Sequence, residues 1–153
     1  MKKSCLLFVA AIASSVGAAA EITVPSTYDE ASGKWIGDVE KLTNALHTAV
    51  AGRVIYLEKG EYDISFLSDN AAPMRVDATD GGSLLSMNKK NMRLVGLTGN
   101  RDDVVITAKN SNHRILTMNA SGTELHGVTI SGGRVLASNA STYKCQTGGG
   151  VYI

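Results

Sequence analysis

The chain repeats part of its own sequence at a fixed interval of 31 residues. Residues 84–99 align with residues 115–130, and six of the 16 aligned positions are identical. A repeat of this period is typical of proteins built as an array of stacked units. Because the repeated segments are short and β-rich, we expect a solenoid of strands rather than of helices. The identical pairs are Leu85/Leu116, Met87/Met118, Asn88/Asn119, Leu94/Leu125, Gly96/Gly127 and Thr98/Thr129.

The repeat also predicts which side chains stack on one another. Alternate apolar side chains should point inward, each about 4.8 Å from the equivalent residue of the neighbouring unit. Leu85 is therefore expected beside Leu116, and Leu94 beside Leu125. Gly96 and Gly127 should mark a bend that requires glycine. The strands expected from this pattern cover residues 84–87, 92–97, 104–108, 114–118, 124–130 and 151–153.

The first 20 residues have the pattern of a secretory signal peptide. Lys2 and Lys3 precede an apolar run over residues 6–16, and small residues follow it up to Ala20, where we expect cleavage. The run is shorter than the roughly 20 apolar residues that span a bilayer; an uncleaved membrane anchor is the alternative. We predict a secreted or cell-surface protein with no transmembrane segment in the mature chain.

The charge of the mature chain is close to balanced. The full sequence has 15 basic and 14 acidic side chains, and removal of residues 1–20 takes away two lysines and leaves 13 basic ones. Nucleic-acid binding normally needs a basic patch, so this balance argues against that class of partner. Cys5 leaves with the signal, and Cys145 is then the only mature cysteine. It is inert, pairs with a cysteine of another chain, or pairs with sequence beyond this chain.

We expect two segments in the mature chain. Residues 21–37 form a polar lead-in with Trp35 as its one large anchor. Residues 38–153 form an N-terminal cap and the first coils of the array, which continues beyond this chain. The cap begins with an amphipathic helix that has Asp38 as its N-cap and stops at Gly52. Its expected elements are an apolar helix face of Val39, Leu42, Leu46, Ala49 and Val50, and strands at 53–58 and 61–64.

This opening resembles a known family. Residues 44–62, with the helix end, Gly52, a strand and the Lys59-Gly60 turn, look like the start of right-handed parallel β-helix proteins of the pectate-lyase-like superfamily. Residues 128–133 and 148–153 are similar to its strand-and-glycine repeats. The resemblance covers residues 38–153 and implies an all-β solenoid, a right-handed parallel β-helix with an N-terminal amphipathic capping helix. It implies no single activity, because the fold hosts lyases, hydrolases, adhesins and phage tail fibres.

The catalytic motifs of this superfamily find no match in the chain. Its lyases resemble one another in an acidic calcium cluster with a basic proton abstractor, and its galacturonan hydrolases in paired aspartates near a His-Gly. His126-Gly127 has the second pattern, but it is the repeat equivalent of Val95-Gly96. We therefore expect His126 to be an outward strand residue, and catalytic residues stay unassigned.

A few polar and aromatic residues are candidates for a site. Asp102 and Asp103 are the one pair of adjacent aspartates in the sequence. They lie where Asp is expected for a turn, and the alternative is a calcium or acid–base role. Carbohydrate sites usually present aromatic faces, and Tyr28, Tyr62 and Tyr143 are the tyrosines left for surface contact, with Tyr62 and Tyr143 the ligand-binding candidates. No metal site is assigned beyond the aspartate pair.

The sequence stops within the expected strand at 151–153. Alignment of residues 84 and 115 with 151 makes the third step 36 residues, with the extra length in the loop 134–147. An array that ended there would expose an unpaired edge and an apolar interior. We therefore expect the N-terminal part of a longer protein, or a truncated reading frame.

These observations favour a secreted or cell-surface β-helix scaffold with a binding or adhesive role. Its partner would be a polysaccharide or a cell-surface molecule, contacted by loops such as 65–82 and 134–147. The alternative is the N-terminal part of an exported polysaccharide lyase or hydrolase that acts on pectin-like acidic glycans. We expect no cofactor, with Ca²⁺ only under the lyase alternative.

Overall fold

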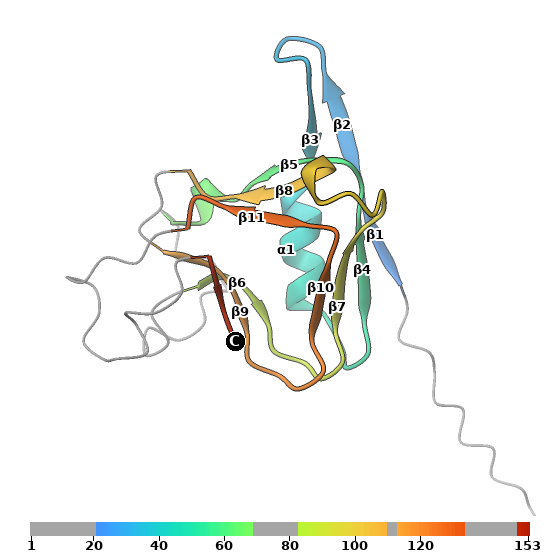
Figure 1. The fold of residues 1–153 in the computed structure, drawn as a ribbon, viewed down its shortest axis with the longest axis vertical. Coiled ribbons are helices and arrows are strands. Elements are labelled where there is room, and N and C mark those ends of the chain that lie inside the picture. Colours follow the sequence, from blue (N-terminus) through green and yellow to red (C-terminus); the bar gives the residue numbers. More distant parts are fainter. Residues whose placement is uncertain (1–20, 69–82, 110–112, 134–149) are drawn as a thin grey trace, which may run out of the picture.

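A computed structural model describes residues 21–68, 83–109, 113–133 and 150–153. The expected signal peptide over residues 1–20, the loop 134–147 and most of the loop 65–82 lie outside the described residues, as do Tyr143 and Cys145. The described residues form one α-helix and three sheets, which Figure 1 shows arranged around a common interior.

The strands expected from the repeat are all present. Five of them appear as single strands, and the segment expected at 124–130 is divided into two. The division falls at Gly127, whose φ of +59° favours glycine. The elements after the helix are β4 (Val54–Leu57), β5 (Gly60–Asp63), the 3₁₀ turn η1 (Ser65–Ser68), β6 (Ser83–Met87), β7 (Arg93–Gly96), the 3₁₀ turn η3 (Arg101–Asp103), β8 (Val104–Thr107), β9 (Arg114–Met118), β10 (Glu124–His126), β11 (Thr129–Ser131) and β12 (Val151–Tyr152).

The lead-in segment contains three strands that the sequence pattern did not predict. They are β1 (Ile22–Val24), β2 (Ser26–Asp29) and β3 (Lys34–Gly37). β2 and β3 form an antiparallel hairpin in which Tyr28 lies opposite Trp35. Figure 1 shows this hairpin extending beyond the rest of the molecule.

The helix α1 (Val39–His47) begins where the sequence predicts. The Asp38 carboxylate accepts a hydrogen bond from the backbone N–H of Lys41 at 2.8 Å, which satisfies one of the free donors of the first turn. The helix buries Leu42 and Leu46, whereas Val50 lies after its end and is exposed. α1 has nine residues, and no helix in the described part of the chain has the length and apolarity to cross a membrane.

The strands form two parallel sheets and one mixed sheet (Figure 1). The first has the order β1-β4-β7-β10, and the second the order β12-β9-β6. The third has the order β11-β8-β5-β3-β2, and it is mixed because β2 and β3 are antiparallel. β3, β5, β8 and β11 are parallel to one another.

The stacking register predicted from the repeat is confirmed. Leu85 pairs with Leu116, and Leu94 pairs with Leu125. The register of β12 on β9 differs from the prediction, because Val151 pairs with Leu116 and not with Ile115. A shift of one residue moves a side chain to the other face of a strand, so Val151 joins the apolar interior with Leu116.

The fold class expected from the sequence is wrong as stated. An all-β solenoid, a right-handed parallel β-helix with only a capping helix added, is not what the described residues form. They form a mixed α/β arrangement of one helix, two parallel sheets and one mixed sheet, and no closed solenoid is seen across the described ranges. The antiparallel hairpin β2–β3 is the main departure, because a pattern of stacked parallel strands does not include it.

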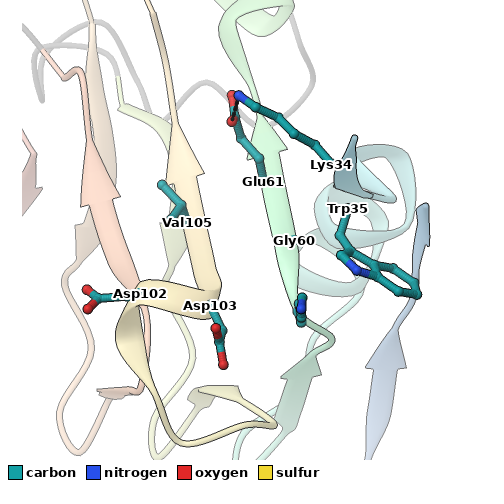
Figure 2. A pocket seen from close by; sticks show the side chains of 8 residues that line it. Lys34, Trp35, Gly60, Glu61, Asp102, Asp103 and Val105 are labelled. Atoms are coloured by element: carbon teal, nitrogen blue, oxygen red, sulfur yellow. Dashed lines mark hydrogen bonds and ion pairs between the residues drawn. The ribbon is translucent and has the colours of Figure 1, made fainter. Parts of the chain in front are cut away.

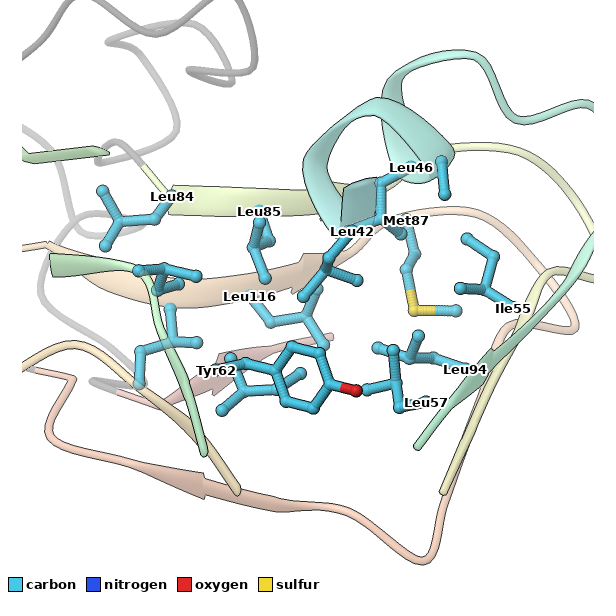
Figure 3. Close-up of a cluster of buried hydrophobic side chains, with 14 of the residues drawn as sticks. Leu42, Leu46, Ile55, Leu57, Tyr62, Leu84, Leu85, Met87, Leu94 and Leu116 are labelled. Carbon is cyan, nitrogen blue, oxygen red and sulfur yellow. The ribbon is translucent and has the colours of Figure 1, made fainter. Parts of the chain in front are cut away.

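The core lies between the sheets and the helix. Figure 3 shows Leu42 and Leu46 of α1 pointing at Leu85 and Met87, with Tyr62 on the far side of the cluster. Two glycines allow close approaches at its margin. A Cβ on Gly37 would overlap the Tyr62 ring, and a Cβ on Gly96 would overlap the carbonyl oxygen of Gly127. The largest fully buried side chains include Arg114, Tyr62, Leu42, Ile55, Leu57, Ile64, Leu84, Leu85, Met87, Met92, Leu94 and Ile106.

Candidate functional site

A shallow groove crosses the mixed sheet near the start of β5 and β8. Its volume is about 220 Å³. Figure 2 shows the hairpin residues Lys34 and Trp35 on one side and the turn residues Asp102 and Asp103 on the other, with β5 between them. The lining residues are Lys34, Trp35, Lys59, Gly60, Glu61, Asp102, Asp103 and Val105.

The hairpin side of the groove carries an exposed aromatic pair. Trp35 is 40% exposed and Tyr28 is 49% exposed. Their ring centroids are 5.5 Å apart and their planes are inclined by 54°. The Lys59 Nζ lies 5.9 Å from the centroid of the Trp35 ring, within the range of a cation–π contact. The strand register holds this pair in place, because Tyr28 and Trp35 are direct neighbours on β2 and β3.

The turn of the hairpin is fixed by Asp29. Its carboxylate accepts hydrogen bonds from the Ser32 hydroxyl at 2.6 Å and from the Ala31 N–H at 3.2 Å. These bonds, led by the Ser32 bond, lower the pKa of Asp29. Gly33 has a φ of +67° and donates its N–H to the Asp29 carbonyl at 2.8 Å, so the chain can reverse at this point.

Glu61 joins three strands of the sheet by ion pairs. It lies on β5 and pairs with Lys34 of β3 at 3.3 Å and with Lys109, which follows β8. The hydrogen bond from Lys109 is the main reason that the pKa of Glu61 is lowered; burial opposes this shift, and Lys34 adds to it. The same contact raises the pKa of Lys109. The ion pairs therefore connect the base of the hairpin to the body of the sheet.

The aspartate pair forms the opposite side of the groove. Asn100 caps the η3 turn, and its side-chain oxygen accepts a hydrogen bond from the N–H of Asp102 at 3.2 Å. The Asp102 carboxylate lies 3.8 Å from Arg101 on an exposed surface. The expected turn role of this pair is confirmed, and both residues also line the groove. Their calcium role stays a prediction; within the described ranges no three His, Cys, Asp or Glu side chains are grouped to hold a metal.

The ligand-binding candidate Tyr62 lies in the core instead of at the surface. Its side chain is fully buried, and its hydroxyl donates to the Glu58 carbonyl at 2.9 Å, with the Val24 carbonyl at 3.3 Å. Burial, helped by the nearby Glu58 charge, raises its pKa far above the usual value. Tyr62 therefore supports the strand that carries the groove but does not contact solvent.

His126 occupies the outward position that the repeat predicts. It pairs with Val95 in the first parallel sheet, is exposed, and has its Nε2 atom 3.0 Å from the Glu124 carboxylate. The groove lies on a different sheet, so His126 is not part of it.

Six of the eight lining residues were not among the sequence candidates, and the groove depends most on three of these: Trp35, Lys59 and Glu61. The signal that could have found them is a hairpin pattern, in which Ser26–Asp29 and Lys34–Gly37 flank a turn that contains Gly33. The hairpin would have placed Trp35 beside Tyr28 at the surface. Glu61 could be identified as a groove residue only if the neighbours of its strand in the sheet were known.

Comparisons with protein-family models, with curated proteins and with solved structures find no match for this chain. The resemblance to the pectate-lyase-like superfamily therefore stays a prediction. The groove combines one exposed aromatic side chain, Trp35, with both donors and acceptors of hydrogen bonds.

Proposed function

We propose that this chain is a secreted or cell-surface binding scaffold and that its groove binds a polysaccharide. The observation that carries the proposal is the exposed Trp35, held beside Tyr28 at the edge of a groove with charged walls. Ligand sites commonly combine apolar and aromatic surface with a few polar groups that fix the orientation of the ligand. Sugars present an apolar ring face and a rim of hydroxyls, so they suit both parts of this groove.

The rigidity of the site supports a binding role. Trp35 and Tyr28 are paired across the hairpin, and Lys34, Glu61 and Lys109 tie the hairpin to the sheet. Side chains that are already held in place lose less conformational entropy when a ligand binds. An exposed tryptophan fixed in this way offers a large contact area at low entropic cost.

The proposal is tested by measuring the affinity of the purified protein for a panel of polysaccharides by calorimetry. The variant Trp35→Ala should weaken binding by about tenfold or more, equivalent to about 1.4 kcal/mol. Phe66→Ala is the matched control, because Phe66 is 49% exposed on η1 and does not line the groove. Equal affinities for the wild type and Trp35→Ala would contradict the proposal.

The exported location is part of the same proposal and has its own test. Sequencing of the N-terminus of the exported protein should give Glu21 as the first residue, because small residues precede it at the expected cleavage site. A mature protein that retains Met1 would contradict cleavage and favour an uncleaved anchor.

A specific observation keeps the enzyme alternative in view. The Asp102–Asp103 pair and Lys59 line the same groove, so carboxylates and a basic side chain are close to one bound ligand. A lyase would use carboxylates for calcium and a basic group to remove a proton. Incubation with polygalacturonate and Ca²⁺ should give no rise in the ultraviolet absorbance of an unsaturated product. A rise that Lys59→Gln abolishes would favour the lyase over the scaffold.

A further inference from the structure

We infer that the groove recognises a neutral, hydroxyl-rich sugar unit and not a charged one. This inference rests on the proposed polysaccharide-binding function and names the class of glycan. It follows from the way in which charges, hydrogen-bonding groups and aromatic surface are distributed around the groove.

The charges of the groove are mixed and give a charged ligand of either sign no clear advantage. Its lining contains two lysines, three carboxylates and no other charged group. Glu61 is engaged by Lys34 and Lys109, and Asp102 lies near Arg101. The carboxylates would repel an anionic sugar that the lysines attract, and the lysines would repel a cationic ligand that the carboxylates attract. A ligand without net charge avoids both repulsions.

Two groups remain for contact with the ligand. Lys59 has its ammonium beside the Trp35 ring, and no ion pair within the described residues engages it. Similarly, no hydrogen bond or ion pair in the described part of the chain engages the Asp103 carboxylate. A lysine only donates hydrogen bonds and an ionised carboxylate only accepts them, whereas a hydroxyl does both. Hydroxyls of a sugar can therefore accept from Lys59 and donate to Asp103.

The aromatic surface supplies the apolar part of the contact. Figure 2 shows Trp35 at the hairpin side of the groove. Tyr28 and Trp35 form an exposed aromatic pair there, and the Lys59 ammonium lies beside the Trp35 ring. The apolar C–H face of a sugar ring can lie on such a patch while its rim of hydroxyls faces the polar groups. The groove volume of about 220 Å³ is below the roughly 300 Å³ of the smallest usual ligand pockets. A ligand in so small and open a groove would lie on the surface, and at most one sugar unit of a chain would fill it.

The test compares neutral glucose- or galactose-based oligosaccharides with oligogalacturonates of the same length, by calorimetry on the full chain. Neutral oligosaccharides should bind about tenfold more tightly or better. Their affinity should change less than about twofold between roughly 0.05 M and 0.5 M NaCl, a range that shortens the Debye length about threefold. Asp103→Asn and Lys59→Gln should each weaken neutral binding severalfold. Glu40→Gln, on the exposed face of α1, is the charge-removing control.

The outcomes separate the inference from the proposed function. Tighter, salt-sensitive binding of oligogalacturonate that requires Trp35 would overturn the neutral-sugar inference and leave the polysaccharide-binding proposal standing. Neutral binding that Asp103→Asn and Lys59→Gln leave unchanged would also overturn the inference. Binding of neither glycan class would refute both.

Discussion

The hairpin β2–β3 and the repeated strands β6, β7, β9 and β10 are stabilised in different ways. The repeated strands bury apolar side chains against their own equivalents, as Leu94 does with Leu125. The hairpin exposes its large side chains and is held by Gly37, which fits against Tyr62, and by the Lys34–Glu61 ion pair. The repeat therefore supplies stability, and the segment outside the repeat supplies the exposed chemistry.

The largest effect is expected in the repeated strands. Leu94→Ala removes a fully buried side chain from the core and should lower the free energy of unfolding by about 3–4 kcal/mol. Leu97→Ala is the matched control, because Leu97 is 51% exposed just after the same strand, and its loss should be below about 1 kcal/mol. Denaturant unfolding measures both. Similar losses would mean that the two leucines do not differ in burial.

Substitution of a glycine within the repeat should have the next-largest effect on stability. Gly96→Ala would place a Cβ against the Gly127 carbonyl oxygen, a backbone atom that cannot rotate away. We expect a loss of about 3 kcal/mol, because the strands must separate to admit the methyl group. Thermal unfolding followed by circular dichroism would measure it, and an unchanged midpoint would show that the stack of glycines at the bend is not required.

Substitution of the hairpin glycine Gly37 should destabilise the protein somewhat less. Gly37→Ala would overlap the Tyr62 ring, which is a side chain and can shift part of the way. The expected loss is about 2 kcal/mol, together with weaker polysaccharide binding, because the hairpin changes its orientation. If Gly37→Ala lost stability but bound normally, the hairpin would not depend on Tyr62 for its position.

The smallest effect is the pH dependence of the Glu61 ion pairs. Since the folded-state pKa of Glu61 lies below the ordinary value of 4.5, its contribution is present above about pH 4.5 and is lost as the pH falls through the folded-state pKa. Lys34 and Lys109 are more than half exposed, so the contribution should be below about 1 kcal/mol. Glu61→Gln should therefore lower the free energy of unfolding at pH 7. It should also reduce the further decrease in that free energy as the pH falls below 4.5.

The control for that measurement is Glu40→Gln, which removes an exposed carboxylate from α1 without touching the sheet. Parallel pH curves for the wild type and Glu61→Gln would mean that the triad of Lys34, Glu61 and Lys109 contributes nothing to the stability of the hairpin base.

The sequence predicted the repeated region well because each of its positions has an equivalent 31 residues away. That equivalence gave the Leu85–Leu116 and Leu94–Leu125 pairs and the outward position of His126. It failed at Val151, where a step of 35 residues replaces the expected 36 and changes the face of the strand. Loop length is not recorded in an apolar pattern, so the register after a long loop is the least certain part of such a prediction.

The hairpin and the groove could not be predicted in the same way. Residues 21–37 have no equivalent in the repeat. Their strands β2 and β3 pair antiparallel across a turn that is closed by a hydrogen bond between Gly33 and Asp29. This missed element also made the predicted fold class wrong. The groove depends on β3, β5 and β8 becoming neighbours, although the residues that line it are spread from Lys34 to Val105. Of the lining residues, the sequence pattern indicated only Asp102 and Asp103, as turn residues with a calcium or acid–base role as the alternative.

The fit between Gly37 and Tyr62 has a mechanical consequence. The Tyr62 ring fills the space where a side chain of residue 37 would be, and its hydroxyl is bonded to backbone carbonyls of Val24 and Glu58. A tilt of the hairpin base toward the core would therefore require the Tyr62 ring to move. The orientation of the hairpin is thereby coupled to the packing of one buried aromatic ring.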